Sequence, residues 1–149
     1  SVALSTPVAR TLVIQTTDFV GSASVGEFEP YRLFGVITTA VSSVAAVRLP
    51  QGATITALRI NAEDDASNNL TVALLRRDFN GDGGGTVASI TTNTNTAGAR
   101  VFSDTTISAP IVDNDSFQYF VRADIEGTSI GTLTLRSVRI EYTVTNPVY

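Results

Sequence analysis

The sequence of 149 residues contains no cysteine, methionine, tryptophan, histidine or lysine. Without cysteine there is no disulfide framework, so stability has to come from packing and from hydrogen bonds within sheets. Cysteine and methionine are also readily oxidised, and their absence suits a protein that works outside the cell. Histidine, cysteine and lysine supply most nucleophile–base pairs, Schiff-base amines and ordinary zinc ligands, so their absence argues against those classes of enzyme.

Carboxylate catalysis, as in glycoside hydrolysis, is the one common mechanism that this inventory leaves open. Glu27 and Glu29 form the candidate pair, but they share one polar segment and no neighbouring feature would raise the pKa of either. We therefore expect the chain not to be an enzyme. We also expect no cofactor, with the exception of a calcium ion discussed below.

Positive charge is scarce as well. All ten basic residues are arginines, and fourteen acidic residues give a net charge of −4. Because binding to nucleic acid usually requires a basic patch, no nucleic-acid partner is expected. The uncharged stretch Leu33–Val47 is too short to span a membrane. The chain starts at Ser1, which fits removal of either a signal peptide or an initiator methionine, and we expect an extracellular or cell-surface location.

The residues that are present favour β-structure. There are 17 valines, 10 isoleucines and 21 threonines, whose branched side chains pack well on a pleated surface. Polar and apolar residues alternate most clearly over Phe117–Ile125. The segment Val41–Val47 fits either a strand or one helical turn. The other strands are predicted at Thr11–Val20, Tyr31–Ala40, Thr54–Ala62, Leu70–Asp78, Val87–Thr92, Arg100–Ile107 and Gly131–Val144.

Turn residues separate these segments. Leu49-Pro50-Gln51-Gly52 marks one turn, and the acidic, asparagine-rich Glu63–Asn69 marks another. The alternation within the last strand changes parity near Arg136 and Ser137, which predicts a β-bulge. Short strands at near-regular spacing with turns between them predict an all-β fold, an antiparallel β-sandwich of the jelly-roll type.

An ordered set of short motifs resembles a loose group of uncharacterised bacterial secreted and surface β-sandwich modules. The resemblance covers Pro50 to Val144 and implies a part of a surface or extracellular protein without a defined active site. The motifs are Leu49-Pro50-Gln51-Gly52-Ala53-Thr54-Ile55-Thr56, Leu74-Leu75-Arg76-Arg77, Val112-Asp113-Asn114, Phe117-x-Tyr119-x-Val121-Arg122 and Val138-Arg139-Ile140-x-Tyr142.

The N-terminal residues 1–20 suggest a mode of assembly. They read as an extended strand that the loop 21–30 separates, as a hinge, from a sandwich domain at residues 31–149. Such a strand can pair with a sheet edge of the next subunit, with Val8, Leu12 and Ile14 as the donated apolar side chains. Repeated head to tail, this contact builds a filament from copies of the chain, so we expect a structural subunit of an extracellular fibre, pilus-like filament or surface layer. Equally, the segment can be the first strand of its own sandwich.

The alternative function is a carbohydrate-binding or adhesin module, whose partner is a glycan. Aromatic side chains form the platforms on which sugar rings stack, and the candidates are Tyr31, Tyr119 and Phe120. Tyr119 shares its face of the predicted strand with Phe117 and Val121, which favours a place in the core.

Calcium is the one metal that the sequence indicates. Asp78, Asn80 and Asp82 occupy alternate positions before Gly83, as at the start of a D-x-N-x-D-G calcium loop. The twelfth position of such a loop is Ser89 rather than a bidentate carboxylate. A glycine-rich hairpin turn accounts for the same residues.

Overall fold

The computed structural model describes residues 3–4, 6–21, 28–29, 32–34, 41–125, 131–145 and 147–148. Helical structure in these ranges is confined to the 3-10 turn η1 (Thr16–Asp18), so no described helix is long enough to cross a membrane. The strands are β1 (Ala3–Leu4), β2 (Val8–Gln15), β3 (Val20–Gly21), β4 (Phe28–Glu29), β5 (Arg32–Phe34), β6 (Val41–Val47), β7 (Thr54–Ala66), β8 (Leu70–Asp78), β9 (Gly84–Thr91), β10 (Thr96–Asp104), β11 (Phe117–Ile125), β12 (Gly131–Val144) and β13 (Pro147–Val148).

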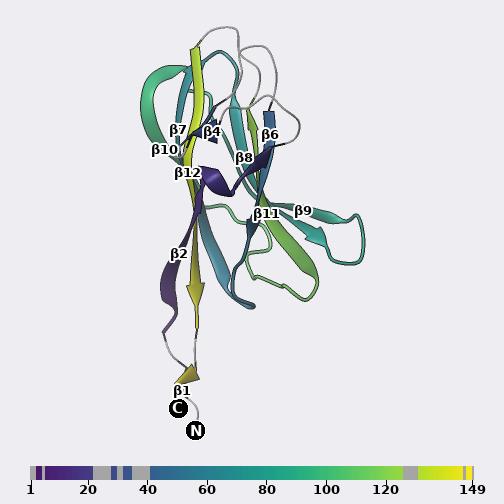
Figure 1. Ribbon diagram of the computed structural model, residues 1–149. Coiled ribbons are helices and arrows are strands. Elements are labelled where there is room, and N and C mark those ends of the chain that lie inside the picture. Colours follow the sequence, from purple (N-terminus) through teal and green to yellow (C-terminus); the bar gives the residue numbers. More distant parts are fainter. Residues whose placement is uncertain are drawn as a thin grey trace.

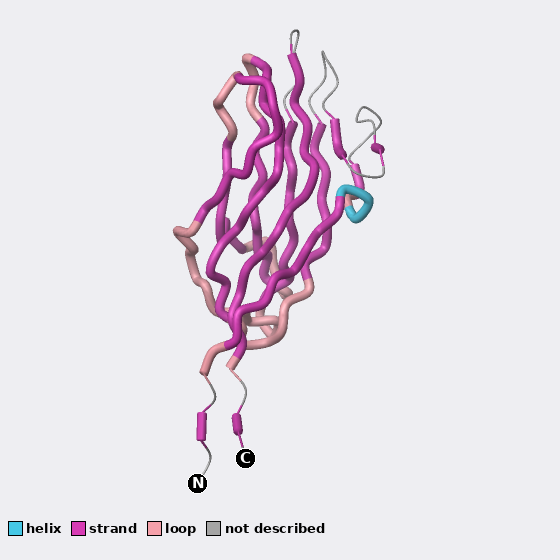
Figure 2. Tube along the Cα trace, turned by 90° about the vertical axis from the view of Figure 1, so that its left-hand side faces the viewer, coloured by secondary structure: helices cyan, strands magenta, loops and turns pink. Residues whose placement is uncertain are grey.

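The strands form two antiparallel sheets packed face to face, with a short ribbon of β1 and β13 at one end (Figure 1). The six-stranded sheet has the order β10-β7-β12-β5-β4, and β2 also pairs with β12. The five-stranded sheet has the order β3-β6-β11-β8-β9. The strands run along the long axis of the molecule, and both ends of the chain lie together at its lower end (Figure 2). The predicted antiparallel β-sandwich is confirmed.

The hydrophobic core lies between the two sheets and is built from alternate residues of the long strands. Successive side chains of a strand point to opposite faces, so every second residue enters the core and the others form the outer surfaces. Strand β11 covers the residues that the alternation predicted, and its Val121 and Ala123 are fully buried. The other fully buried apolar side chains include Leu58, Ile60, Leu70, Val72, Leu74, Leu135, Val138 and Ile140.

The structure decides one segment whose sequence pattern was ambiguous and corrects another. The ambiguous Val41–Val47 is a strand, because β6 pairs with β11 along its whole length. The predicted turn at Glu63–Asn69 begins later, because β7 continues to Ala66 and pairs there with Gly131 of β12. Pairing with β12 thus keeps this acidic stretch extended, although the sequence alone predicts a turn there.

Strand β12 contains the predicted bulge. Leu135 pairs with Ala62 and Ser137 pairs with Asn61, so Arg136 is the extra residue between two successive pairs with β7. The extra residue reverses the alternation, which is why the buried side chains after it begin at Val138.

The prediction of a donated N-terminal strand is wrong. Strand β2 pairs with β12 of its own chain from Val8↔Val144 to Ser137↔Gln15. Of the three proposed donor side chains, Ile14 is 3% exposed and belongs to the core, Leu12 packs partly against the core, and Val8 is exposed. The strand that donation would need is thus paired along its whole length within its own chain. Most of the predicted hinge at residues 21–30 lies outside the described residues.

Candidate functional site

The outer face of the five-stranded sheet is the surface that carries the candidate site. On its central strand β11, Tyr119 and Val121 point into the core, so Gln118, Phe120 and Arg122 point outward. The register places Phe120 between Ala46 of β6 and Leu75 of β8. An aromatic ring therefore occupies the middle of an outward face.

Phe120 differs from most aromatic side chains of the described residues. Phe19 and Tyr119 are buried, whereas Phe102, Phe117 and Tyr142 pack partly against the core cluster. Phe120 is half-buried outside that cluster. Its ring is therefore held by neighbouring outer side chains and keeps one part open to solvent.

Apolar side chains extend the surface around Phe120 across the strands. Val44 lies on the outward side of β6. It pairs with Val20 of the edge strand β3, and the Val20 side chain is 71% exposed. Together with Ala46 and Leu75, these residues form a band across β3, β6, β11 and β8, which we call the apolar band. Its composition suits the flat, weakly polar faces of sugar rings.

Polar side chains border the apolar band on both sides. On one side, Gln118 pairs with Arg77 of β8, and Arg48 follows the last residue of β6. On the other side, the Arg122 Nε donates a hydrogen bond to the Asp124 Oδ2 at 2.9 Å. The Ser42 hydroxyl donates to the other oxygen of Asp124 at 2.7 Å. These contacts fix the Asp124 carboxylate, and the polar borders supply both donors and acceptors of hydrogen bonds.

Two neighbouring hollows indent this surface. The first, of about 480 Å³, opens where β6 and β11 diverge, and its walls include Arg48, Leu49, Asn114 and Gln118. The second, of about 340 Å³, is lined by Leu75, Arg76, Arg77, Asp82, Gly83, Gly84, Gly85, Thr86, Phe120 and Arg122. Because Gln118 and Phe120 are two residues apart on one face of β11, the hollows adjoin along this strand.

The hairpin between β8 and β9 forms one wall of the second hollow and projects from the body of the sandwich (Figure 1). The Asp78 N–H donates to the carbonyl of Gly83 at 2.8 Å and closes the turn. Gly84 has a φ of +152°, and a Cβ there would overlap the carbonyl oxygen of Arg76. The close approach of the two strands therefore requires glycine at this position.

The turn before β11 forms part of the first hollow. The Asn114 side chain donates to the carbonyl of Leu49 at 2.8 Å, and the Asn114 N–H donates to the Gln51 side chain at 2.6 Å. The Asp113 carboxylate accepts hydrogen bonds from the N–H groups of Asp115 and Ser116. Hydrogen bonding by the Ser116 side chain lowers the pKa of Asp113 below its usual value, and this outweighs the opposing effect of desolvation. The wall of the hollow is thus a hydrogen-bonded turn.

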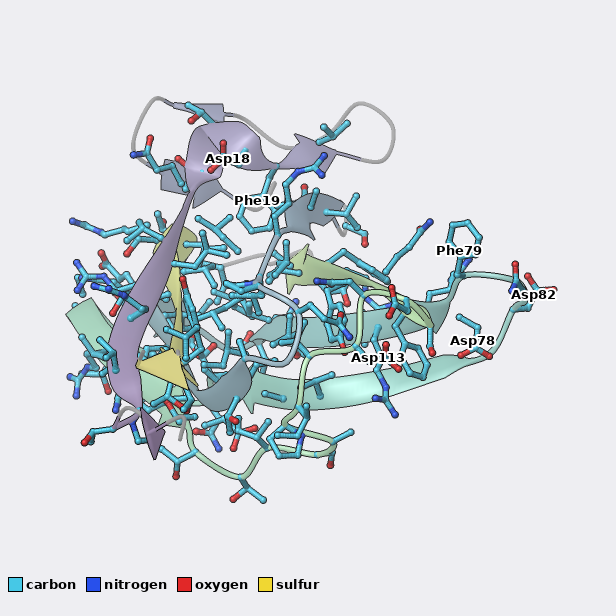
Figure 3. The ribbon with its side chains drawn as sticks, turned by 90° about the horizontal axis from the view of Figure 1, so that it is seen from below. Asp18, Phe19, Asp78, Phe79, Asp82 and Asp113 are labelled. Atoms are coloured by element: carbon cyan, nitrogen blue, oxygen red, sulfur yellow. The ribbon has the colours of Figure 1, made fainter. Side chains whose placement is uncertain are left out.

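The predicted calcium ligands lie in the turn of the β8–β9 hairpin. Asp78, Asp82 and the 64% exposed Phe79 sit on the part of the hairpin that points away from the body (Figure 3). Among the described residues, acidic side chains gather nowhere in a group of three or more that could hold a metal ion. The arrangement is that of a glycine-rich hairpin, and it gives the calcium hypothesis no support.

Tyr119, one of the two predicted sugar-binding tyrosines, is placed differently from Phe120. Tyr119 is 6% exposed, and its hydroxyl accepts a hydrogen bond from the Asp113 N–H at 3.1 Å. It contributes only an edge to the first hollow and offers no open ring. Tyr31 lies outside the described residues, as do the side chains of Glu27 and Glu29. Of the two candidate aromatics that the structure describes, Phe120 is therefore the one on an outer face.

The outer face of the six-stranded sheet has a different character. Two of its arginines are paired with acids: the Arg59 Nε lies 2.8 Å from the Glu141 Oε1, and the Arg136 Nη2 lies 3.7 Å from the Glu63 Oε2. Arg59 also donates to the Ser103 hydroxyl at 2.7 Å. On this sheet, the hollow around Val101 measures about 170 Å³, and the hollow beside Tyr142 measures about 450 Å³. The Tyr142 ring packs against the core cluster, so this second surface lacks a comparable aromatic platform within the described residues.

No protein-family model matches the sequence, and no curated protein matches it either. Solved structures do share its fold. One is the C-terminal family 6 carbohydrate-binding module (CBM6) of LamC, a marine laminarinase from Zobellia galactanivorans, with a TM-score of 0.56 and 11% identity. That alignment covers 88% of this chain and 98% of the module. Another is the xylan-binding module CBM15, with a TM-score of 0.55 and 12% identity over 90% of this chain and 97% of the module.

These similarities establish the fold and correct the functional prediction. The chain has a β-sandwich of the jelly-roll type, which is also the fold of these carbohydrate-binding modules. The architecture predicted from the sequence is therefore confirmed. The prediction of a filament subunit is wrong, because the strand that would link subunits is paired within its own sheet and the similar folds are those of carbohydrate-binding modules.

Proposed function

We propose that the chain is a non-catalytic carbohydrate-binding module that holds a polysaccharide across the outer face of its five-stranded sheet. The observation that carries this proposal is the half-buried Phe120 in the apolar band, bordered by Arg77, Gln118 and Arg122 and indented by two hollows. The similarity in fold to a laminarinase-borne module and to a xylan-binding module supports it. The absence of histidine, cysteine and lysine from the sequence supports a role in binding without turnover.

The physical basis of binding is the two-sided character of a sugar ring. The ring's C–H groups pack on the Phe120 face and on the apolar band, while its hydroxyl groups exchange hydrogen bonds with the bordering side chains. Gln118 offers both a donor and an acceptor, and Asp124 offers acceptors that Ser42 and Arg122 already hold in position. Such preorganisation lowers the entropy lost when a sugar binds. Because polysaccharides of this kind occur outside the cell, we place the protein there.

The test is affinity for soluble laminarin, xylan and polygalacturonate, measured by isothermal titration calorimetry and by retardation in polysaccharide-containing native gels. Phe120→Ala should weaken binding by about 2 kcal/mol, or about 30-fold, because a central aromatic anchor is lost. Phe79→Ala is the matched control, since Phe79 is an exposed phenylalanine that lines neither hollow. Thermal denaturation should show that both variants are folded.

The proposal fails if none of the three polysaccharides binds. It also fails if Phe120→Ala binds as tightly as the unaltered protein. Loss of binding in Phe79→Ala alone would place the site at the tip of the hairpin instead.

A further inference from the structure

We propose that the polysaccharide bound by this face is anionic and carries carboxylate or sulfate groups on its sugars. This inference rests on the proposed function and specifies its substrate class. The feature behind it is the charge of the two hollows. Three arginines whose side chains lie on the outer face, Arg48, Arg77 and Arg122, line them, against the single carboxylate of Asp82. The chain as a whole has a net charge of −4, so this concentration of positive charge runs against the overall balance.

The arginines of the outer faces differ in how they are paired. On the six-stranded sheet, Arg59 and Arg136 each contact a glutamate, whereas the exposed Arg139 makes no ion pair with a described residue. On the five-stranded sheet, Arg48 and Arg77 are exposed and make no ion pair with any described residue. An unpaired guanidinium on a surface is well hydrated and ready to bind an anion, and its planar fork matches a carboxylate or a sulfate.

The positions of these arginines suit a chain-like ligand that crosses the strands. Arg77 lies opposite Gln118 of β11, and Arg48 lies one residue beyond the Tyr119↔Val47 pair on the other side of that strand. Two strand spacings separate them, or about 10 Å between their backbones. Two charges at this separation can engage different sugars of one polymer whose rings lie along the neighbouring apolar band.

Arg122 adds positive charge to the same outer face, although it is already paired. The Arg122 Nε contacts Asp124, which uses one of the five N–H donors of that guanidinium. Arg76 is not counted among the arginines of this face, because it lies opposite the inward-facing Tyr119 and over the Phe117 ring, at 4.0 Å from its centroid, on the other side of the sheet. A neutral polysaccharide would cover the charges of the outer face without compensating them, whereas an anionic one would pair with them, and this difference creates selectivity.

The test compares polymers that differ in charge but not in backbone. We expect polygalacturonate to bind at least tenfold more tightly than its methyl ester, and dextran sulfate more tightly than dextran. The first pair reports recognition of carboxylates and the second reports recognition of sulfates. Binding to the charged polymers should weaken as the salt concentration rises, because salt screens exposed charges. Arg77→Gln and Arg48→Gln should each weaken it about two- to fivefold, as expected for an exposed ion pair.

Arg139→Gln is the matched control, since Arg139 is an exposed arginine on the outer face of the six-stranded sheet. It should leave binding unchanged. If laminarin or xylan binds as tightly as polygalacturonate and neither Arg48→Gln nor Arg77→Gln has an effect, the inference of an anionic ligand is overturned while carbohydrate binding stands. If no polysaccharide binds, the proposed function itself falls. Equal affinity for duplex DNA and polygalacturonate would overturn the assignment to a polysaccharide.

Discussion

Replacing Gly84 with alanine is expected to distort the hairpin that forms a wall of the second hollow. The φ of +152° at Gly84 is rarely adopted by residues with a side chain, and an added Cβ would overlap the Arg76 carbonyl oxygen. The neighbouring Gly85 provides the control, because a Cβ there would have no heavy atom within 4 Å and its φ is not positive. Both residues pair with β8, so the two variants differ mainly in strain.

The size of the effect follows from these two environments. A side chain held at a disfavoured φ costs about 1–3 kcal/mol, and the overlap with Arg76 adds to that cost. At an unstrained position, replacing glycine with alanine stabilises by about 0.4–1 kcal/mol. The free energies of unfolding of Gly84→Ala and Gly85→Ala should therefore differ by about 2–4 kcal/mol. For a domain of this size the difference corresponds to about 4–16 °C in Tm.

Thermal and urea denaturation followed by far-ultraviolet circular dichroism measure this difference directly. The Gly84→Ala variant should unfold earlier than the unaltered protein, and Gly85→Ala should unfold at the same point or slightly later. Equal midpoints for the two variants would refute the steric argument. A larger loss in Gly85→Ala would mean that the two strands of the hairpin pair in a different register.

Two further predictions concern the fold around the site. Ile14→Ala should lower the free energy of unfolding in urea by about 3 kcal/mol because it opens a cavity in the core, whereas Val13→Ala on the outer side of the same strand should cost far less; equal effects would mean that β2 is not an integral strand. Because the pKa of Asp113 is lower in the folded state, its ionised carboxylate stabilises the fold, and this contribution is fully present at pH values above the ordinary pKa of 3.8. The contribution is lost as the pH falls through the lower pKa of the folded state. The urea midpoint of Asp113→Asn should consequently depend less on pH in this range than that of the unaltered protein, and parallel pH profiles would contradict the assignment.

The sequence predicted the architecture well where local periodicity decides it. Alternation alone located β11, and the change of parity at Arg136 located the bulge in β12. The turn at Pro50 was recognisable from its residues, since Gly52 has the positive φ that the turn requires and the Ala53 N–H donates to the Pro50 carbonyl. These features depend on residues that are close together in the chain.

Features that depend on distant partners were not predictable in this way. The pattern of Val8–Gln15 shows that the segment is a strand, but it does not show whether its partner is β12 or a neighbouring molecule. Asp64 lies within an acidic stretch that reads as a turn, and only the ladder to β12 explains why it is buried in a strand. In both cases the deciding contacts join residues far apart in the sequence.

In the candidate site, too, some features follow from nearby residues and others from strands that are distant in the sequence. The outward direction of Phe120 follows from its parity opposite to Tyr119 and Val121, so the sequence contains that information. Its association with Arg48 and Arg77 does not follow, because it requires the strand order β6-β11-β8. The hollows form only once these three strands lie side by side.

Binding of a polysaccharide across the five-stranded sheet is tested most directly by a nuclear magnetic resonance titration of the ¹⁵N-labelled protein with oligosaccharides of galacturonate, laminarin and xylan. This mode of binding predicts that amide shifts will change in β6, β8 and β11, centred on Phe120, while the amides around Arg59 and Arg139 remain unaffected. Changes centred on the six-stranded sheet, or no changes with any of these oligosaccharides, would contradict it.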